Sequence, residues 1–555
     1  MARNNEPELV FCPLGGVGEI GMNFALYGLG PAGAREWIVV DVGVTFPDAT
    51  LPGVDLVLPD TRFIESEVAN LRGIVITHAH EDHYGALLDI WPRLKKPVWM
   101  TPFSAGLLGA KRRMDGGPEI PVQIFNAGDR FQVGPFDIEA VGVTHSIPEP
   151  VSLAIRTPLG MVVHTGDWKI DPAPTIGRKT DEQRFRALGD EGVRALICDS
   201  TNAMREGESP SEEAVGEGLK GVIEAAAGRV AVTTFSSNVG RIRSIAEAAR
   251  DAGRQVLVLG SSLKRVINVA TELGYLDGLP EFVEEDDYGY IPRENLVILC
   301  TGSQGEPRAA LAKLARDEMR NVALSPGDTV VYSSRVIPGN EKAILETKNL
   351  LIEQGIKIIE DSDALVHVSG HPRRNELKRM YEWTRPQVLV PVHGEAAHLV
   401  AHGALGASAG IREVAQVRNG DMIRLAPGPA EIIDQVPSGR MFKDGKLIGS
   451  DETMGIRDRR KLSYVGHVAV NVVLDDRYEI AGDPDLVAVG VAKADAAGEE
   501  LEELMLDAAI GAIESIPRVR RKDLDLVAEA VRRAVRSAAN DAWGKKPIVT
   551  VFVTR

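Results

Sequence analysis

The sequence predicts an α/β protein of several domains. Its 555 residues correspond to roughly three or four domains of 100–200 residues each. Short apolar runs that end in Gly, Pro or Asp alternate with helical stretches, a pattern typical of layered α/β domains. Hydrophobic residues make up 44% and charged residues 26%, so wholesale disorder is excluded.

The order of these runs predicts one domain inserted into another. Residues 1–205 and 366–455 share one style of short buried strands, whereas residues 206–365 alternate strands and helices as a parallel α/β unit does. Strands of the first style are expected at 37–40, 73–77, 136–143, 161–164, 364–368 and 388–393. In the insertion we expect a helix at 212–227 and strands at 230–234, 255–259, 296–299 and 329–332.

A small third domain is predicted at residues 466–555, after a charged linker at 456–465. Strands are expected near 466–474, 485–491 and 547–554, and helices near 498–515 and 523–541. Pro517 and the basic run that follows it separate the two helices. This mixture predicts a compact α/β module.

Composition restricts the classes of function. The net charge is 63 − 79 = −16, which argues against a generally basic nucleic-acid-coating protein but not against a localised basic groove. The cysteines Cys12, Cys198 and Cys300 are too far apart for a disulfide framework or a cysteine-based zinc site, as expected in a reducing cytosol. The N-terminus lacks a signal-peptide pattern, and no apolar run reaches the roughly 18–20 residues that span a bilayer. We therefore expect a cytoplasmic protein that does not associate with membranes.

A glycine-rich motif near the N-terminus is rejected as a dinucleotide site. Gly16, Gly18 and Gly21 have the required spacing, but the residues that follow, 22–27, read as a strand instead of a helix. A tight turn between two strands is the preferred interpretation.

The segment 73–83 predicts a metal site. His78, His80, Asp82 and His83 directly follow an apolar strand, and imidazole and carboxylate groups are suitable donors for zinc or a similar divalent ion. His78 and His80 can point together from the strand end, while Asp82 and His83, past the turn, can address a neighbouring centre. The alternative is a polar surface loop.

Other polar side chains end apolar strands in the same manner. His145, Asp167 and His393 do so, and active sites of α/β folds gather at the carboxyl ends of strands, so these groups are expected to converge. His164 lies inside its apolar run and is interpreted as structural. No role is predicted for His398, His402 and His467.

This constellation resembles the metallo-β-lactamase superfamily, which implies an αββα sandwich and hydrolysis assisted by two metals. The resemblance assigns one divalent ion to His78, His80, His145 and Asp167, and a second to Asp82, His83, Asp167 and His393, with Asp167 bridging. It makes Asp41 an acid that supports the ligands. Zn²⁺ is the expected metal, with Mn²⁺ or Mg²⁺ as alternatives that support activity.

Three further segments resemble motifs A, B and C of the β-CASP nucleases: 195–202, which contains Asp199, 367–374 and 391–395. With the insertion, they make nearly the whole chain similar to the bacterial ribonuclease J family. The resemblance implies 5′→3′ exoribonuclease activity on 5′-monophosphate ends, additional endonuclease activity, and roles in rRNA maturation and mRNA decay. It also implies a homodimer or homotetramer, with residues 466–555 as the oligomerisation domain, and partners in an RNA-degradation complex.

The same resemblance proposes residues for catalysis and substrate binding. Asp82, Asp199 and His371 are expected to be catalytic, with His371 stabilising the transition state or protonating the leaving oxygen. A 5′-terminal phosphate is expected to contact two loops, listed here in full: Ser236, Ser237 and Asn238, and His367, Val368, Ser369, Gly370 and His371. The alternative for both loops is an ordinary turn or capped helix start.

Three alternatives to a ribonuclease stay open at this point. A DNA-directed β-CASP nuclease would keep the metals, and so would a glyoxalase-type thioesterase, against which the insertion and His371 count. A metal-less RNA-binding scaffold would be expected to lose ligands, whereas every expected ligand position is filled. Basic clusters at 111–113, 264–265, 373–374 and 378–379 are candidates for offsetting the acidic balance near RNA.

Overall fold

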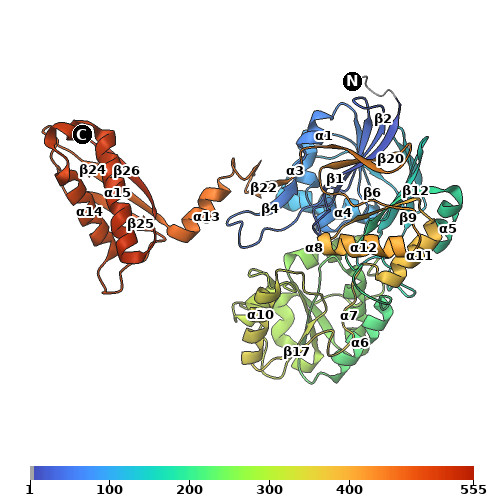
Figure 1. The fold of residues 1–555 in the computed structure, drawn as a ribbon. Helices are drawn as coiled ribbons and strands as arrows, with labels where there is room; N and C mark the ends of the chain where they lie inside the picture. The colour runs from blue at the N-terminus through green and yellow to red at the C-terminus, as the bar shows by residue number, and fades with distance from the viewer. Residues whose placement is uncertain (1–5) are drawn as a thin grey trace. The chain divides into compact units, whose positions relative to one another are not determined.

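The computed structural model describes residues 6–555, which divide into two compact units (Figure 1). The first unit includes the chain up to Thr45 and Val57–Arg440, and the second contains Phe46–Leu56 and Met441–Arg555. Residues 1–5, on which the signal-peptide expectation partly depends, lie outside the described residues. No helix of residues 6–555 has the length and apolar character needed to cross a bilayer.

The first unit is built around two β-sheets that enclose a common core. The first sheet runs in the order β21 (Glu431–Gln435), β20 (Asp421–Ala426), β1 (Glu8–Gly15), β2 (Phe24–Gly30), β3 (Glu36–Val40), β5 (Leu71–Val75), β6 (Val98–Met100) and β7 (Val122–Ile124). The second runs β19 (Glu413–Val414), β18 (Val388–Val392), β12 (Val193–Asp199), β11 (Gly160–His164), β10 (Val151–Thr157), β9 (Phe136–Gly142) and β8 (Arg130–Val133). Phe11 and Ile38 of one sheet share a buried cluster with Leu153 and Ile197 of the other.

Helices complete the layers of this sandwich. The first sheet is connected through α1 (Arg62–Ser66), α2 (Glu81–Tyr84), α3 (Leu87–Leu94) and α4 (Pro102–Asp115), and β4 (Leu56–Pro59) precedes α1. The second sheet is covered by α5 (Glu182–Glu191), α11 (Arg374–Thr384) and α12 (Ala396–Ser408). Phe185, Leu377 and Leu405 carry this contact, because they pack against Val163 and Leu196 of the sheet. The four layers therefore agree with the predicted fold.

The glycine-rich motif forms a turn, as predicted. β1 and β2 pair antiparallel, and Gly16, Gly18 and Gly21, which lie between them, all adopt positive φ angles. Side chains with a Cβ rarely adopt this conformation, so glycine is needed there. The turn places Asn23 directly before β2.

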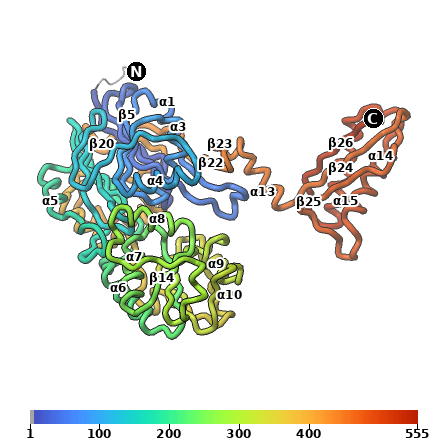
Figure 2. Tube along the Cα trace, turned by 180° about the vertical axis from the view of Figure 1, so that it is seen from behind, coloured from blue at the N-terminus to red at the C-terminus, as the bar shows by residue number. Residues whose placement is uncertain are grey.

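The insertion is a separate parallel α/β layer structure, drawn in green and yellow in Figure 2. Its sheet has the order β14 (Gln255–Leu259), β15 (Leu296–Cys300), β13 (Val230–Thr233), β16 (Thr329–Tyr332) and β17 (Lys357–Ile359). Its helices are α6 (Glu212–Ala225), α7 (Val239–Asp251), α8 (Ser261–Glu272), α9 (Ala310–Ala315) and α10 (Glu341–Glu353), with 3₁₀ turns at Glu285–Tyr290 and Arg293–Asn295. The parallel arrangement confirms the prediction from the alternating pattern.

The strand predicted at 364–368 is wrong, since this segment has no regular secondary structure. Its carbonyl groups bond to side chains instead of a neighbouring strand: Val366 O accepts hydrogen bonds from Arg241 Nη1 (3.2 Å) and Ser333 Oγ (2.6 Å). Both donors belong to the insertion. The apolar run therefore forms part of the segment that connects the insertion back to the sandwich.

The second unit has a three-stranded sheet in the order β25 (Asp485–Val489), β24 (His467–Val473) and β26 (Ile548–Thr554). The helices α14 (Leu501–Ser515) and α15 (Leu524–Trp543) cover one face through a shared buried cluster. The unit also contains the hairpin β22 (Arg440–Asp444) and β23 (Leu447–Gly449), and a 3₁₀ turn at Arg518–Lys522. The segment expected as a linker forms the helix α13 (Ile456–Val465).

Candidate metal centre

Two groups of side chains converge at the strand ends of the sandwich. They are His78, His80, His145 and Asp167 in one group, and Asp82, His83, Asp167 and His393 in the other; within each group the candidate ligand atoms lie within 4.8 Å of one another. Asp167 belongs to both groups. Its Oδ2 lies 3.2 Å from His83 Nε2 and 3.6 Å from His145 Nε2. The structure thus brings together all seven residues predicted as metal ligands.

Asp41 holds the turn that carries these histidines. Its carboxylate accepts hydrogen bonds from Thr77 N (2.8 Å) and from His83 Nδ1 (2.7 Å). The bond to Nδ1 leaves Nε2 of His83 facing Asp167. A carboxylate on the second ring nitrogen is the arrangement commonly found behind a metal-binding histidine.

The motif-B loop supports the first group through Gly370. Its carbonyl accepts a hydrogen bond of 2.7 Å from His145 Nδ1, so that Nε2 points toward His80. A Cβ at position 370 would lie 2.5 Å from this Nδ1, which leaves room for glycine alone. Gly370 therefore orients the candidate metal ligand His145. The sequence predicted only a substrate contact for this residue.

Two buried atoms at the centre have no hydrogen-bond partner among the described residues: Asp167 Oδ1 and His393 Nε2. Buried polar atoms are rarely left without a partner unless they bind an ion or water. Histidine nitrogens together with carboxylate oxygens match the donors preferred by zinc and similar divalent ions. The residues present therefore fit a divalent metal.

Burial keeps three of the five candidate histidines neutral, whereas the charges of Asp167, Asp82 and Asp41 outweigh burial at His83 and raise its pKa well above the usual value. Burial lowers the pKa of His80 to about 4, and burial together with the neighbouring imidazoles lowers the pKa of His78 and His145 well below the usual value. Although burial opposes ionisation of Asp167, the charges of His393 and His83 lower its pKa. Neutral imidazoles and an ionised carboxylate are the forms that bind a metal.

His371 lies beside the two groups and bonds to Asp199, and with Asp199, Asp167 and His393 it forms a third set whose candidate ligand atoms lie within 4.8 Å of one another. Its Nδ1 donates a hydrogen bond of 2.8 Å to Asp199 Oδ2, at the end of β12, and lies 3.9 Å from Asp167 Oδ2. Burial lowers the pKa of His371, but the charges of Asp199 and Asp167 outweigh it and raise the value to about 9. The imidazolium form therefore predominates at neutral pH, with its Nε2 proton available.

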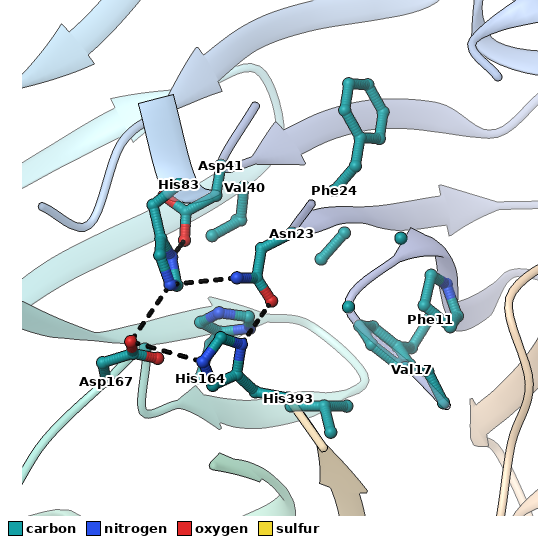
Figure 3. Close-up of a pocket in the computed structure, with 16 residues that line it drawn as sticks. Phe11, Val17, Asn23, Phe24, Val40, Asp41, His83, His164, Asp167 and His393 are labelled. Atoms are coloured by element: carbon teal, nitrogen blue, oxygen red, sulfur yellow. Dashed lines mark hydrogen bonds and ion pairs between the residues drawn. The ribbon is translucent and has the colours of Figure 1, made fainter. Parts of the chain in front are cut away.

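Asn23 was not predicted as a functional residue, yet it connects the second group (Figure 3). Its Oδ1 accepts a hydrogen bond of 3.0 Å from His393 Nδ1, and its Nδ2 donates one of 3.0 Å to the carbonyl of Asp82. This places Nε2 of His393 toward Asp167 and Asp82. The only sequence signal was its position directly after the glycine-rich turn.

Replacing Asn23 with alanine is expected to lower the affinity for a divalent ion at the group that contains His393 more than at the group that contains His145. Loss of an outer hydrogen bond to a metal-binding histidine typically costs 10–100-fold in affinity. Titration calorimetry with Zn²⁺ would show one site weakened by about that factor. Asn70→Ala is the control, because Asn70 bonds to Glu67 away from the centre. Equal affinities in Asn23→Ala and the parent protein would contradict this prediction.

The loop expected to bind phosphate lies at the junction of the sandwich and the insertion. Asn238 caps α7, since its side chain accepts a hydrogen bond from Arg241 N (2.9 Å). It also lines a small cavity together with His145 and Gly240. His367 is half-buried, and both of its ring nitrogens are buried without a hydrogen-bond partner among the described residues. Ser369 accepts a hydrogen bond of 3.0 Å from Asn202 Nδ2, and Val368 is buried.

His402 supports the strand end that carries Asp199. It is fully buried, and its Nδ1 lies 2.8 Å from Ser200 Oγ. Burial lowers its pKa to about 4. The ring is therefore neutral in the folded protein at pH values where it would be charged in the unfolded chain.

This difference predicts a loss of stability in acid. Between pH 6.5 and 4 the unfolded state binds more protons at His402, so the free energy of unfolding falls by about 2 kcal/mol at pH 5. His402→Gln should remove this part of the decrease, measured by urea unfolding at pH 7.5 and 5. His398→Gln, on the same helix but partly exposed, is the control. The same decrease in His402→Gln as in the parent would show that His402 does not contribute.

Family models match four segments of the chain. They are described as "Beta-lactamase superfamily domain" (36–182), "Ribonuclease J, beta-CASP domain" (227–351), "Zn-dependent metallo-hydrolase RNA specificity domain" (355–415) and "Ribonuclease J C-terminal domain" (454–555). The first and third segments contribute the candidate ligands, and the second is the inserted α/β layer. They identify the sandwich as a metallo-β-lactamase domain with a β-CASP insertion.

Known proteins of similar length are also related to the chain. It is 65% identical over 551 residues to a ribonuclease J from Sinorhizobium meliloti, covering 99% of this chain and 98% of the relative. It is 37% identical to a ribonuclease J from Mycolicibacterium smegmatis, covering 97% and 96%. A crystal structure of a protein of unknown function from Enterococcus faecalis shares the fold, with a TM-score of 0.51 and 16% identity over 75% of this chain and all of that one. The sequence, the fold and these relatives agree that the chain belongs to the ribonuclease J family.

Proposed function

We propose that this metal-dependent ribonuclease is a 5′→3′ exoribonuclease that prefers 5′-monophosphate ends and also cleaves internally. The observation that carries the proposal is the pair of ligand groups sharing Asp167, placed beside His371 and next to the loop of Asn238. The family match supports RNA as substrate. Maturation of rRNA and decay of mRNA are the processes that this activity would serve.

Two divalent ions, with Zn²⁺ proposed and Mn²⁺ or Mg²⁺ as alternatives, would be held by the two groups. His78, His80, His145 and Asp167 would hold one, and Asp82, His83, Asp167 and His393 the other. When bound, such ions polarise a phosphoryl oxygen and lower the pKa of water. The side chain of Asp82 is 30% exposed, so it can also orient water at the mouth of the site.

His371 is proposed to protonate the leaving oxygen of the phosphodiester bond. Asp199 accepts a hydrogen bond from Nδ1, which fixes the ring, and its charge favours the imidazolium form, in which Nε2 also carries a proton. A positioned acid of this kind typically contributes 10²–10⁴-fold to the rate. Asp199 therefore acts on the substrate through His371.

The 5′-terminal phosphate is proposed to lie between the two predicted loops. Ser236 and Ser237 offer hydroxyls just before α7, and the free ring nitrogens of His367 lie among Arg241, Glu212 and Lys169. The cavity beside His145 and Asn238 is a place for such a group. Ser369 and Gly370 follow His367 in the chain and connect this pocket to the metal groups, because the carbonyl of Gly370 accepts a hydrogen bond from His145.

One assay tests the proposal. RNA labelled at its 5′ end, with either a monophosphate or a triphosphate, is incubated with the pure protein and Mn²⁺ or Mg²⁺. We expect labelled mononucleotide from the monophosphate form alone. Internal fragments from both forms would mean that endonuclease action dominates. No cleavage of either RNA would reject the proposal and direct attention to DNA or to a binding scaffold.

The remaining assignments concern assembly and location. We propose a homodimer or homotetramer through residues 466–555, because the open sheet face exposes Val487 (60%), Val489 (65%) and Phe552 (58%), which a second copy would cover. Light scattering of the full chain measures the assembly.

We propose domain boundaries at 205/206, 365/366, 455/456 and 465/466. We also propose a cytoplasmic location, where RNA and RNA-degradation partners are found.

A further inference from the structure

We propose that the guanidinium groups of Arg205, Arg335 and Arg373 together bind a backbone phosphate of RNA beside the metal centre, an inference that rests on the proposed ribonuclease function. The three arginines come from three separate segments. Arg205 follows β12, Arg335 follows β16 of the insertion, and Arg373 precedes α11. None of the residues named so far for the 5′-terminal phosphate belongs to this group.

Asn202 is the point at which the three segments meet. Its Oδ1 accepts a hydrogen bond of 2.7 Å from Arg335 Nη1, and its backbone carbonyl accepts one of 2.8 Å from Arg205 N. The carbonyl of Arg205 in turn accepts a hydrogen bond of 3.0 Å from Arg374 N. Arg373, the preceding residue, is therefore adjacent to Arg205.

The positive charges of Arg205 and Arg373 act on Arg335. Burial and the charges of Arg205 and Arg373 lower the pKa of Arg335, although Asp361 opposes this. Like charges held close together are unfavourable, and an anion between them relieves the repulsion. The geometry of the Asn202 turn thus creates a local excess of positive charge.

No carboxylate of residues 6–555 forms a salt bridge with any of the three arginines, although the chain has 79 acidic and 63 basic residues. Two nearby acidic residues are paired with other arginines: Glu206 Oε1 lies 3.0 Å from Arg374 Nε, and Glu208 Oε1 lies 3.7 Å from Arg379 Nη1. Asp361 attracts Arg335 but forms no salt bridge with it among the described residues. The Nε atoms of Arg373 and Arg374 are both buried without a hydrogen-bond partner among the described residues, but only Arg374 Nε has a carboxylate oxygen nearby, Glu206 Oε1 at 3.0 Å. An external anion is therefore the missing partner.

The position of the cluster identifies this anion by its chemistry. Nδ2 of Asn202 donates hydrogen bonds to the carbonyl of His371 (3.1 Å) and to Ser369 Oγ (3.0 Å). Asn202 therefore links the arginines by hydrogen bonds to the turn that carries His371, the proposed general acid. Guanidinium groups match phosphate oxygens with paired hydrogen bonds. A phosphodiester of an RNA strand whose scissile bond lies at the metal groups is the matching ligand.

The test is the salt dependence of kcat/KM for the metal-loaded full chain on a 5′-monophosphorylated RNA. For single strands, each neutralised phosphate contributes about 0.7 to the slope of log affinity against log salt concentration. Arg335→Gln should make the slope shallower by about this amount and raise KM by roughly tenfold, with little change in kcat. Arg335→Lys, which keeps the charge, should retain most of the slope.

Arg374→Gln is the matched control, because Arg374 is adjacent in the chain but paired with Glu206. It should leave the slope unchanged. Arg373→Gln should reproduce the effect of Arg335→Gln, and the thermal midpoint of each variant shows whether it folds. Inorganic phosphate should raise KM of the parent more than that of Arg335→Gln.

The outcomes separate this inference from the proposed function. A parent enzyme that cleaves RNA, together with unchanged slopes in Arg335→Gln and Arg373→Gln, would overturn the phosphate site alone. A parent that cleaves no RNA would overturn both. An effect of inorganic phosphate without a change in slope would mean that a free anion binds there instead of RNA, which also overturns the proposal.

Discussion

Replacing Asp167 with alanine is expected to lower RNA hydrolysis by more than about a thousandfold. Asp167 is the residue shared by both ligand groups, and its Oδ2 lies between 3.2 and 3.9 Å from five different histidines. Without this carboxylate neither group retains all its donors. Mass spectrometry of the dialysed protein should show loss of bound metal in parallel with the loss of activity.

The control for this variant is Asp190→Ala, which removes an exposed carboxylate from the same domain. It should keep both the metal content and the activity. Because removing a buried carboxylate also lowers the stability of the fold, circular dichroism must show that Asp167→Ala is folded before its activity is compared. Near-normal cleavage by Asp167→Ala without bound metal would contradict the metal assignment.

Replacing His371 with alanine is expected to lower kcat by about 10²–10⁴-fold while both metals stay bound. The reason is that His371 is proposed to supply the proton for the leaving oxygen, and Asp199 orients it through a 2.8 Å hydrogen bond. Single-turnover kinetics with saturating enzyme would isolate this step from RNA binding. A reduced metal content in His371→Ala would assign the residue to the metal groups instead.

Asp199→Asn provides a second measurement of the same interaction. It keeps the imidazole but removes the negative charge that raises the pKa of His371 to about 9. Since the protonated form is the active one, the alkaline fall in kcat should move to lower pH in this variant. An unchanged pH profile would show that another group donates the proton.

Local patterns predicted the parts of the site that are close in sequence. His78, His80, Asp82 and His83 follow one strand within six residues, so their spacing alone indicated two neighbouring centres. Strand ends also indicated His145, Asp167 and His393, because parallel strands deliver their carboxyl ends to one edge. The family resemblance was needed to divide these residues into two groups.

The supporting contacts could not be predicted, because they join distant parts of the chain. Asn23 bonds to His393 across 370 residues, and Gly370 bonds to His145 across 225. Neither residue belongs to a motif that indicates a hydrogen bond of this kind. The prediction of a strand at 364–368 is wrong for the same reason. Its apolar residues indicated a strand in a sheet, but side chains of the insertion form hydrogen bonds with its backbone.

The interruption of the sandwich by its insertion has a consequence for the order of events during synthesis. Asp167 precedes the insertion and His393 follows it, so 393 − 167 = 226 residues separate two members of one ligand group. At 5–20 residues per second, a ribosome needs roughly 10–45 s to make this stretch. During that interval the nascent chain holds an incomplete second group. The nascent chain therefore lacks a complete second ligand group until the return segment that carries His393 has been made.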